Sequence, residues 1–454
     1  MMSILIKNAY IATADESSPI IKEGSIYVED GIIAEIGKEV QTRSAEFVID
    51  GRDKIVTPGL INTHVHLAQG ILRGLVPDNV ALIEWLRDWV WPLQGNMDEE
   101  IMDVSTKLTL LEMINGCTSS FVATSINARY GVERVIENVY RSGMRAAIGK
   151  QIMDIPGYAD HPQMLHQGLI EDPELSFKIF NDAYSRWHGR DGRIWIWFSP
   201  RTPSAVSDEL FRRIAEIVRE KNSGVTMHLA EVRDDIRYFA GRGTTPGRFL
   251  KELGMVGRRF LYVHGVWLNE DDMKIFASTG TSVSHNPSSN CKLGSGIAPV
   301  VKMLKSGVNV ALGTDGGPSN DDYDMIREMK LALLLQKVSN LDPQSIDVFT
   351  VLRMATVNGA YAMGIENEVG KLKKGMKADI AVFNTKAPHL VPRIQPLSNL
   401  VYSGTGNDCT DLIVDGKFLK RNGKVLTIDE NEVYEKVDKY AAELLSRTKL
   451  HSWM

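Results

Sequence analysis

The histidines of this chain follow a pattern that suggests metal binding. Five of the ten histidines and one aspartate stand at or near the ends of short apolar runs: His64, His66, His228, His264, His285 and Asp315. His64 and His66 are two residues apart, so on a strand both imidazoles point to the same face and can bind one ion. Taken singly, such residues can also be buried and bonded to the backbone, or belong to a turn. Because His64, His66, His228 and Asp315 all fall at the same end of one predicted fold, we expect them to be metal ligands.

Three imidazoles and one carboxylate suit Zn²⁺ or Fe²⁺, with a water completing the sphere. Such a metal lowers the pKa of its bound water to about 7 and provides hydroxide at neutral pH. Binuclear barrel hydrolases often bridge two metals with a carboxylated lysine on the fourth strand, and the predicted fourth strand, RIWIWFSP, has no lysine. Lys150, on the third strand, is expected to be solvated or paired. We therefore expect one divalent transition metal, Zn²⁺ in first place and Fe²⁺ as the alternative.

Two further residues at these strand ends could move protons. Glu231 follows His228 by three residues and could carry a proton from the water to a substrate ring and its leaving group. The alternative for Glu231 is a solvated loop carboxylate or a helix cap. His264 could polarise the nucleophile or the tetrahedral intermediate, or it could support the site structurally.

The elements that position these residues alternate between apolar runs and amphipathic segments. The eight runs expected to be strands are IVTPGLINTHVH, CTSSFVA, MRAAIGKQIM, RIWIWFSP, GVTMHLAE, RFLYVHGV, TSVSHN and NVALGTDG. Strands that alternate with helices, such as those expected at 208–222 and 300–307, favour a parallel sheet covered by helices. Eight such units predict an α/β fold, a (β/α)8 barrel over residues 57–365, with catalysis at the C-terminal strand ends. A doubly wound sheet, the alternative, predicts a glycine-rich turn after the first strand, and none is present there.

Both ends of the chain are rich in strand patterns. Residues 1–56 contain three β-branched stretches, and a matching pattern returns over residues 366–428. Asp30-Gly31, Asp415-Gly416 and Asn422-Gly423 are hairpin signals. We expect one small β-sandwich domain built from both termini. Residues 429–454 are expected to form a closing helix and tail.

Composition excludes several classes of protein. The 454 residues carry a net charge of −5, which gives no general attraction to nucleic acid or to anionic membranes. No apolar stretch approaches 18 residues and the first residues do not resemble a signal peptide. Cys117, Cys291 and Cys409 are odd in number and widely separated, and are expected to form neither a disulfide framework nor a metal clip. A reducing compartment, the cytoplasm, is therefore expected.

Five motifs together resemble the amidohydrolase superfamily: PGLINTHVH, HLAE, His264-Gly265, SHNPSSNCKLGSGIAP and GTDGGPSND. The resemblance covers nearly the whole chain, including GKLKKGMKADIAVF near the C-terminus. It is most specific for the branch that contains adenosine-type, guanine-type and S-adenosylhomocysteine deaminases and triazine hydrolases. The resemblance implies that His64, His66, His228 and Asp315 are the metal ligands.

The resemblance also implies a reaction. Glu231 matches the proton shuttle, His264 the catalytic histidine, and Asp315 a base toward the water. Hydroxide would add to an electron-poor carbon of a purine-, pterin- or triazine-like ring, and ammonia would depart. Expulsion of chloride or an alkylamine from a triazine-like ring is the alternative within this branch. Hydrolysis of an amide or cyclic amide, and a barrel that serves only as a scaffold, are the hypotheses from other classes.

The substrate pocket is expected to include Gln69, Trp85, Gln94 and Met153. By the resemblance, Trp85 matches a position that packs on the substrate ring, although it could equally be a core tryptophan. Gln94 stands where nucleoside deaminases carry a glutamate for the ribose diol, which weakens the nucleoside interpretation because a neutral amide binds a diol less strongly. Gln69 and Gln94 are instead similar to the pocket of triazine hydrolases, or are surface or supporting glutamines. Met153 could line the pocket or pack in the core. Partners are expected to be a small heteroaromatic substrate and further copies of the chain, in a dimer or tetramer.

Overall fold

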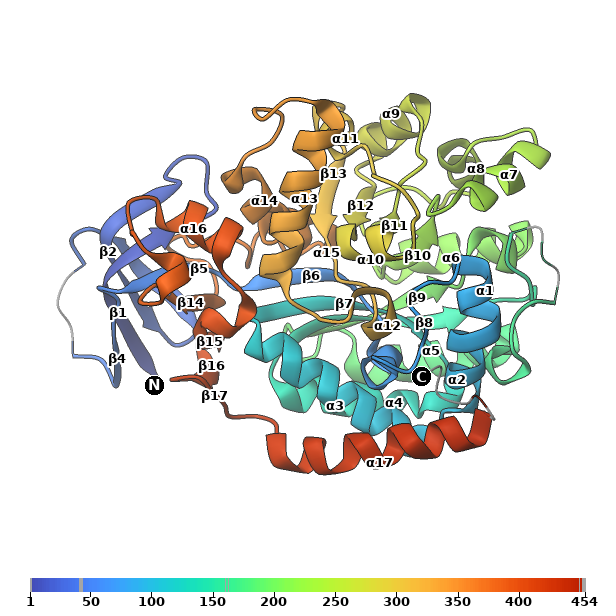
Figure 1. Cartoon of the computed structure of the whole chain (residues 1–454), viewed down its shortest axis with the longest axis horizontal. Helices are drawn as coiled ribbons and strands as arrows, with labels where there is room; N and C mark the ends of the chain where they lie inside the picture. Colours follow the sequence, from blue (N-terminus) through green and yellow to red (C-terminus); the bar gives the residue numbers. More distant parts are fainter. Residues whose placement is uncertain (1, 41–43, 160, 162, 449, 451–454) are drawn as a thin grey trace.

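The computed structural model describes residues 2–40, 44–159, 161, 163–448 and 450. The strands of these residues form two sheets, one of eight parallel strands and one of nine mixed strands. Figure 1 shows the parallel sheet within a shell of helices and the mixed sheet at one end of the molecule. Part of the predicted tail, residues 449 and 451–454, lies outside the described residues.

The parallel sheet runs in chain order from β6 to β13. The first and last strands meet where the Thr63 Oγ1 hydroxyl donates to the Leu312 carbonyl, at 2.8 Å, and at a bridge between Val65 and Asp315. The sheet therefore nearly closes into a barrel, as the sequence predicts. Its strands are β6 (Leu60–Val65), β7 (Thr118–Ile126), β8 (Arg145–Ile152), β9 (Ile194–Pro200), β10 (Val225–Leu229), β11 (Phe260–His264), β12 (Ser282–His285) and β13 (Asn309–Leu312).

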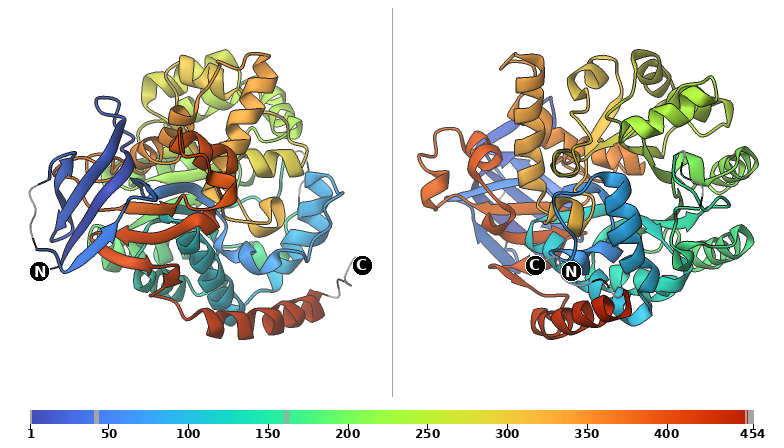
Figure 2. Two further views of the ribbon diagram at one scale, coloured as in Figure 1. Left: turned by 60° about the vertical axis from the view of Figure 1, so that its left-hand side comes forward. Right: turned by 45° about the vertical axis from the view of Figure 1, so that its right-hand side comes forward.

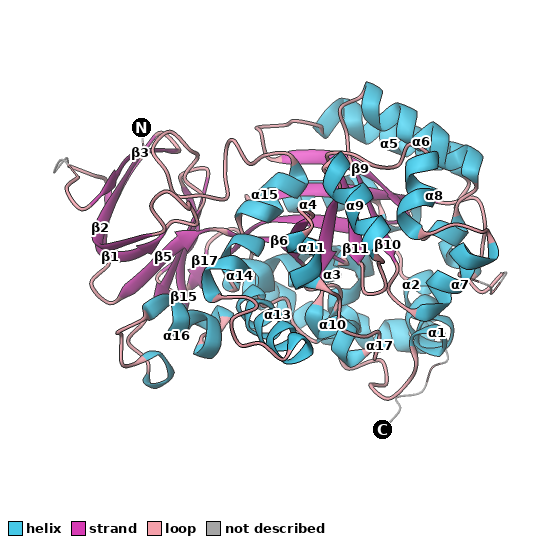
Figure 3. Cartoon of the chain, turned by 90° about the horizontal axis from the view of Figure 1, so that it is seen from above, coloured by secondary structure: helices cyan, strands magenta, loops and turns pink. Residues whose placement is uncertain are grey.

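Helices surround the parallel strands (Figure 3). Helix α6 (Asp208–Glu220) shows why: Leu210, Ile214 and Val218 recur every four residues, so one stripe is buried against the barrel. The Ser207 Oγ accepts from the Leu210 N–H at 3.2 Å and caps its first turn. The other helices are α1 (Leu82–Glu84), α2 (Trp91–Asn96), α3 (Glu99–Asn115), α4 (Val132–Ser142), α5 (Pro173–Trp187), α7 (Arg233–Gly241), α8 (Pro246–Glu252), α9 (Glu270–Thr279), α10 (Pro287–Lys292), α11 (Val300–Lys305), α12 (Gly317–Asn320), α13 (Met325–Asn340), α14 (Val348–Met354), α15 (Val357–Met363), α16 (Pro396–Ser403) and α17 (Glu430–Thr448).

The first predicted barrel strand, IVTPGLINTHVH, is divided between the two sheets. Its beginning belongs to β5 (Lys54–Pro58), which pairs with β1 and β14 of the mixed sheet. The barrel strand β6 starts only at Leu60. Gly59 lies between them, packed so closely on Ser119 that a Cβ there would collide with it. The apolar run alone does not reveal this break, because both halves are buried.

The mixed sheet joins the two ends of the chain, as predicted. Figure 2 shows the N-terminal and C-terminal strands side by side at one end of the molecule. Its remaining strands are β1 (Ser3–Ala12), β2 (Ile20–Glu29), β3 (Ile32–Gly37), β4 (Phe47–Asp50), β14 (Ile380–Asn384), β15 (Cys409–Val414), β16 (Lys417–Arg421) and β17 (Lys424–Val425). An apolar core of its own contains Ile4, Ile26, Val56 and Ile380. The strands are connected in one continuous sheet, and the domain limits at 56/57 and 365/366 stay a prediction.

The three predicted hairpin turns are present. Each is a two-residue loop between paired strands, and both residues of each loop have positive φ: Asp30 48° and Gly31 81°, Asp415 53° and Gly416 73°, Asn422 50° and Gly423 81°. This is the type I′ geometry that Asp-Gly and Asn-Gly favour.

The mixed sheet is joined to the barrel by a buried ion pair and a disulfide. Arg145 Nε on β8 donates to Asp379 Oδ2 at 2.6 Å. Cys117, just before β7, is disulfide-bonded to Cys409 on β15, with 5.9 Å between their Cα atoms. The expectation that the cysteines form no disulfide is therefore wrong. Separation by 292 residues hid the pair, because the composite fold brings the start of a barrel strand beside a strand from the other end of the chain.

The helix expected within residues 429–454 is present as α17, which spans Glu430–Thr448. It lies along α3 beneath the barrel (Figure 1). Val433 and Leu444 are buried, and Arg447 Nη1 lies 2.6 Å from Asp98 Oδ2. No helix in the described part of the chain has the length and apolar character needed to cross a membrane.

Candidate active site and metal centre

Four predicted metal ligands converge at the C-terminal end of the barrel. His64 lies in β6 and His66 directly follows it, His228 lies in β10, and Asp315 follows β13. One ligand atom from each of the four side chains lies within 4.8 Å of the other three. The sequence places these residues on strands far apart in the chain, and barrel closure brings them together.

The contacts within this group fit a shared cation. His66 Nε2 lies 3.1 Å from His228 Nε2, and Asp315 Oδ1 lies 3.1 Å from His64 Nε2 and 3.2 Å from His66 Nε2. Ser289 Oγ donates to the other carboxylate oxygen, Oδ2, at 2.6 Å and holds it in place. Imidazole nitrogens and a carboxylate oxygen this close together form a set of donor atoms that suits a transition metal.

The electrostatics keep these ligands in their metal-binding forms. Burial lowers the pKa of His64 to about 4 and that of His228 well below its ordinary value, so both rings are neutral at pH 7. Burial alone would raise the pKa of Asp315, but hydrogen bonds with His64 and His66 outweigh it and hold that pKa well below the ordinary value. The centre thus offers neutral imidazoles and one charged carboxylate.

Four non-glycine residues at this end of the barrel have a left-handed backbone. Ser125, Ala230, His264 and Asp315 have φ of 55°, 52°, 74° and 69°. Non-glycine residues with such angles cost on the order of 1–3 kcal/mol each and cluster at functional sites. These turns orient the side chains at the strand ends toward the barrel mouth. The periodicity of the sequence does not reveal such turns.

Glu231 and His264 lie together beside the ligands. His264 Nε2 is 3.5 Å from Glu231 Oε2, and the other ring nitrogen, Nδ1, is 2.9 Å from Asn290 Oδ1. Burial raises the pKa of Glu231 to about 7, a value suited to proton transfer near neutral pH. Asp235, which could have competed for such a role, instead accepts from the Glu231 N–H at 2.8 Å at the start of α7.

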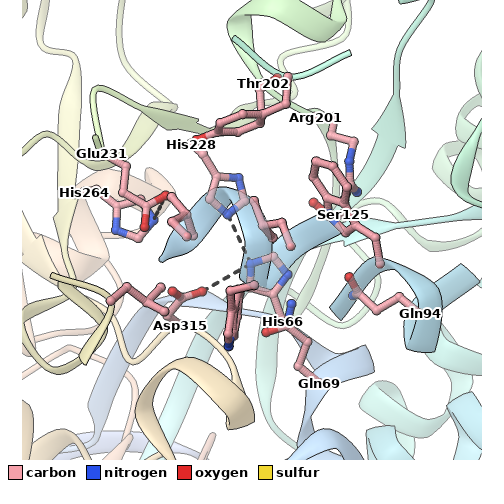
Figure 4. Close-up of a pocket in the computed structure, with 16 residues that line it drawn as sticks. His66, Gln69, Gln94, Ser125, Arg201, Thr202, His228, Glu231, His264 and Asp315 are labelled. Atoms are coloured by element: carbon pink, nitrogen blue, oxygen red, sulfur yellow. Dashed lines mark hydrogen bonds and ion pairs between the residues drawn. The ribbon is translucent and has the colours of Figure 1, made fainter. Parts of the chain in front are cut away.

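These groups face one pocket at the mouth of the barrel (Figure 4). It is lined by His66, Gln69, Leu82, Trp85, Leu86, Trp91, Gln94, Ser125, Tyr158, Arg201, Thr202, His228, Glu231, His264, Leu293 and Asp315. Three of the four residues predicted for the substrate pocket, Gln69, Trp85 and Gln94, are among them. Met153 is not: it packs in the apolar core at 1 % exposure, where its thioether gains most from burial.

Several buried polar atoms of the cavity wall have no hydrogen-bond partner among the described residues. They are Gln69 Oε1, Trp85 Nε1 and His264 Nε2. Buried polar groups without partners are uncommon in folded proteins. We take these atoms to be positioned for a ligand.

Some residues of the cavity wall are not among those predicted from the sequence. Arg201 and Thr202 directly follow β9, so the strand-end rule that found the histidines could have found them too. Tyr158 comes from the long segment after β8, which carries no such signal.

Lys150 is paired, which is one of the two states expected for it. Its ammonium group contacts Glu171 and donates to the Gln151 carbonyl at 2.7 Å.

Residues 55–419 match the amidohydrolase family. The chain is 39 % identical to a 5′-deoxyadenosine deaminase of Methanosarcina mazei, over 98 % of this chain and 99 % of that protein. It is also 39 % identical to a 5-methylthioadenosine/S-adenosylhomocysteine deaminase of Thermococcus onnurineus, over 92 % and 94 %. The chain therefore belongs to the amidohydrolase family, as its motifs predict, and is a hydrolase of the type that acts on carbon–nitrogen bonds.

Solved structures agree with this assignment. An adenosine deaminase from Xanthomonas campestris with bound zinc has a TM-score of 0.90 and 26 % identity, covering 98 % of this chain and 99 % of that one. An atrazine chlorohydrolase from Arthrobacter aurescens complexed with zinc has a TM-score of 0.88 at 24 % identity, over 96 % and 100 %, and shows the shared fold. With the four-ligand group, the zinc-bound adenosine deaminase supports a divalent metal in this chain.

Proposed function

We propose that this protein is a mononuclear, metal-dependent aminohydrolase that replaces the amino group of an N-heteroaromatic ring by oxygen from water. The observation that carries the proposal is the buried His64–His66–His228–Asp315 group with Glu231 beside it, all facing one cavity. The deaminase names of the relatives support an amino leaving group, and adenosine-type substrates are one class to test.

His64, His66, His228 and Asp315 would hold one divalent metal, Zn²⁺ in first place and Fe²⁺ as the alternative. When bound, such a metal supplies hydroxide at neutral pH, because it lowers the pKa of water to about 7. Zinc is supported by the nitrogen- and oxygen-rich donor set and by the zinc-containing neighbours.

Glu231 and His264 carry the proton chemistry. A protonated Glu231 donates its proton to a ring nitrogen, which makes the neighbouring carbon electrophilic. After hydroxide has added to that carbon, the Glu231 carboxylate accepts the proton of the new hydroxyl group and passes it to the departing amine. His264 is held through Nδ1 by Asn290, so its Nε2 is directed at the nucleophile and stabilises the developing oxyanion. Asp315, whose pKa is held low, serves as base toward the water.

Gln69, Trp85 and Gln94 are proposed to hold the ring. The indole of Trp85 offers a surface for stacking, and the two amides offer hydrogen bonds to ring substituents. The position of Gln69 and Gln94 in the cavity wall also favours a second candidate function, expulsion of chloride or an alkylamine from a triazine-like ring. Both reactions use the same nucleophile and differ in the leaving group.

Two expectations accompany this function. The family resemblance supports a homo-oligomer, a dimer or tetramer, which light scattering on the purified protein measures. The cytoplasm is supported by composition alone, and the Cys117–Cys409 disulfide weighs against a strongly reducing compartment.

The test is Glu231→Gln in protein of known metal content. Ammonia, chloride and new carboxylate are measured with adenosine derivatives, guanine, 8-oxoguanine, pterins, melamine and chlorotriazines. We expect the wild-type enzyme to release ammonia from one of these rings, and the variant to keep its metal while losing on the order of 100- to 10,000-fold in turnover. Turnover that survives Glu231→Gln nearly unchanged would show that the proton-transfer role is wrong.

A further inference from the structure

One side chain of the cavity wall is a buried cation without an opposite charge. Arg201 is 8 % exposed and directly follows β9. Within the described residues, no carboxylate oxygen lies within 4.0 Å of its guanidinium nitrogens. Burying an unpaired charge is costly, so an arginine in this state requires an explanation.

Two other basic side chains buried in the barrel show the usual arrangement. Arg145 donates to Asp379 and Asp415 at 2.6–3.1 Å, and Lys150 contacts Glu171. Both have carboxylate partners and neither lines the cavity. Arg201 differs in both respects, which suggests that its partner arrives with the ligand.

Neutral groups hold Arg201 in a defined orientation. Its Nη1 donates to Gln151 Oε1 at 3.0 Å, and its guanidinium carbon lies 5.0 Å from the centre of the Trp91 ring. Gln151 is itself fixed, because its Nε2 donates to the Leu169 carbonyl at 3.0 Å. The structure gives Nε and Nη2 no hydrogen bond within the described residues, and Arg201 lines the cavity.

Arg201 lies across the cavity from the acid–base groups. Figure 4 shows Glu231 and His264 on one side, Arg201, Ser125 and Gln94 on the other, and His66 and His228 between them. The two carboxylates of the lining, Glu231 and Asp315, both belong to the metal side. The side near Arg201 thus has a cation and neutral amides, and no carboxylate for a sugar diol.

We infer that Arg201 determines specificity for an aminated heteroaromatic ring that also carries an oxo oxygen, which the guanidinium binds on the edge of the ring away from Glu231. This inference rests on the proposed function. The fork of two N–H groups matches a carbonyl oxygen with an adjacent ring nitrogen, as in arginine recognition of the O6 and N7 atoms of guanine. A ring that offers only nitrogen acceptors leaves part of that fork unpaired in a buried site.

Matched ring pairs test the inference. Isoguanine and adenine share the 6-amino group and differ at the 2-oxo group, and guanine and 2-aminopurine share the 2-amino group and differ at the 6-oxo group. We expect the oxo member of at least one pair to have a kcat/KM about 10- to 100-fold above its partner, the effect of a charge-assisted hydrogen bond. Equal or preferential turnover of the ring without oxygen would overturn the inference and leave the proposed function intact.

Arg201→Met and Arg201→Lys separate a specificity role from a structural one. Arg201→Met should remove the preference, lowering kcat/KM for the oxo ring by about 10- to 100-fold and leaving the other ring within a few-fold. Arg201→Lys keeps the charge without the fork and should be intermediate. Arg213→Met, an exposed arginine on α6, is the control. Equal losses on both rings would mean that Arg201 acts only structurally.

Binding supplies a readout independent of turnover. In metal-loaded Glu231→Gln protein, calorimetry with isoguanine and adenine should show tighter isoguanine binding, and adding Arg201→Met should abolish the difference. Should no ring release ammonia from wild-type enzyme, the proposed function fails while this binding comparison still decides the role of Arg201. Thermal melting and metal analysis of each variant confirm that it is folded.

Discussion

The two sides of the cavity are built differently. On the metal side, His64 and His264 lie in strands and Asp315 lies just beyond β13. Side-chain contacts hold them, including Asp315 with Ser289 and His264 with Asn290. The opposite side contains Trp85 and Gln94 from the short helical turns before α3, with Tyr158 from the segment after β8. There Trp85 Nε1 has no partner among the described residues.

From this difference we infer that the metal side carries out the reaction and that the opposite side selects the substrate. Strand ends hold the groups that we propose to activate water and move protons, where a small error in position would be costly. The opposite side is built from helical turns and a loop segment, and its Trp85 Nε1 donor is available to a ligand. The following changes test that division, from the largest expected effect on activity to the smallest.

Loss of the carboxylate ligand should have the largest effect. Asp315→Asn removes the one charged ligand and the base, so metal content should fall and activity should drop by at least about 1,000-fold. Metal analysis and steady-state rates measure the two effects. Asp321→Asn, an exposed neighbour, is the control and should change neither. Full metal occupancy with normal turnover in Asp315→Asn would contradict the ligand assignment.

Removing the hydrogen bond that holds His264 should lower activity less than Asp315→Asn does. Asn290→Ala removes the acceptor at Nδ1, so His264 can turn away from Glu231. We expect kcat to fall about 10- to 100-fold, the usual range for such supporting contacts, with metal content unchanged. An unaltered kcat would place His264 outside the chemistry.

On the substrate side, changes should alter selectivity rather than the reaction. Gln94→Glu adds a carboxylate that can accept two bonds from a sugar diol. Because bonds to an ionised acceptor are about twice as strong as neutral ones, KM for ribosides should fall several-fold and kcat should change little. Assays with adenosine and adenine distinguish this from a general effect. A matching fall in KM for the free base would show that Gln94 does not face the sugar.

The smallest effect on activity is expected outside the cavity. Removing the Cys117–Cys409 bond in a double serine variant should lower the free energy of unfolding by roughly 2–4 kcal/mol and leave kcat/KM unchanged. Denaturant unfolding with and without reductant measures the change. A large loss of activity in the folded variant would mean that the mixed sheet controls the site.

The sequence predicts the metal side well, because strand ends of a parallel barrel meet and because the spacing of His64 and His66 is readable. It predicts the other side only in part. Gln69, Trp85 and Gln94 line the cavity, and Met153 packs in the core, one of its two expected places, whereas Arg201 is not among the predicted pocket residues although it follows a strand end. The Cys117–Cys409 pair and the break at Gly59 depend on how the two sheets meet, which no local pattern encodes.

We propose above that this chain activates water with a bound metal to displace an amino group. The most direct measurement follows the reaction in oxygen-18-labelled water, with mass spectrometry of the product and an ammonia assay, on enzyme stripped of metal and then titrated with Zn²⁺ or Fe²⁺. We expect one labelled oxygen in the product for each ammonia released, at a rate that rises in proportion to metal bound and saturates at one ion per chain. Turnover by metal-free enzyme, or product without the label, would contradict it.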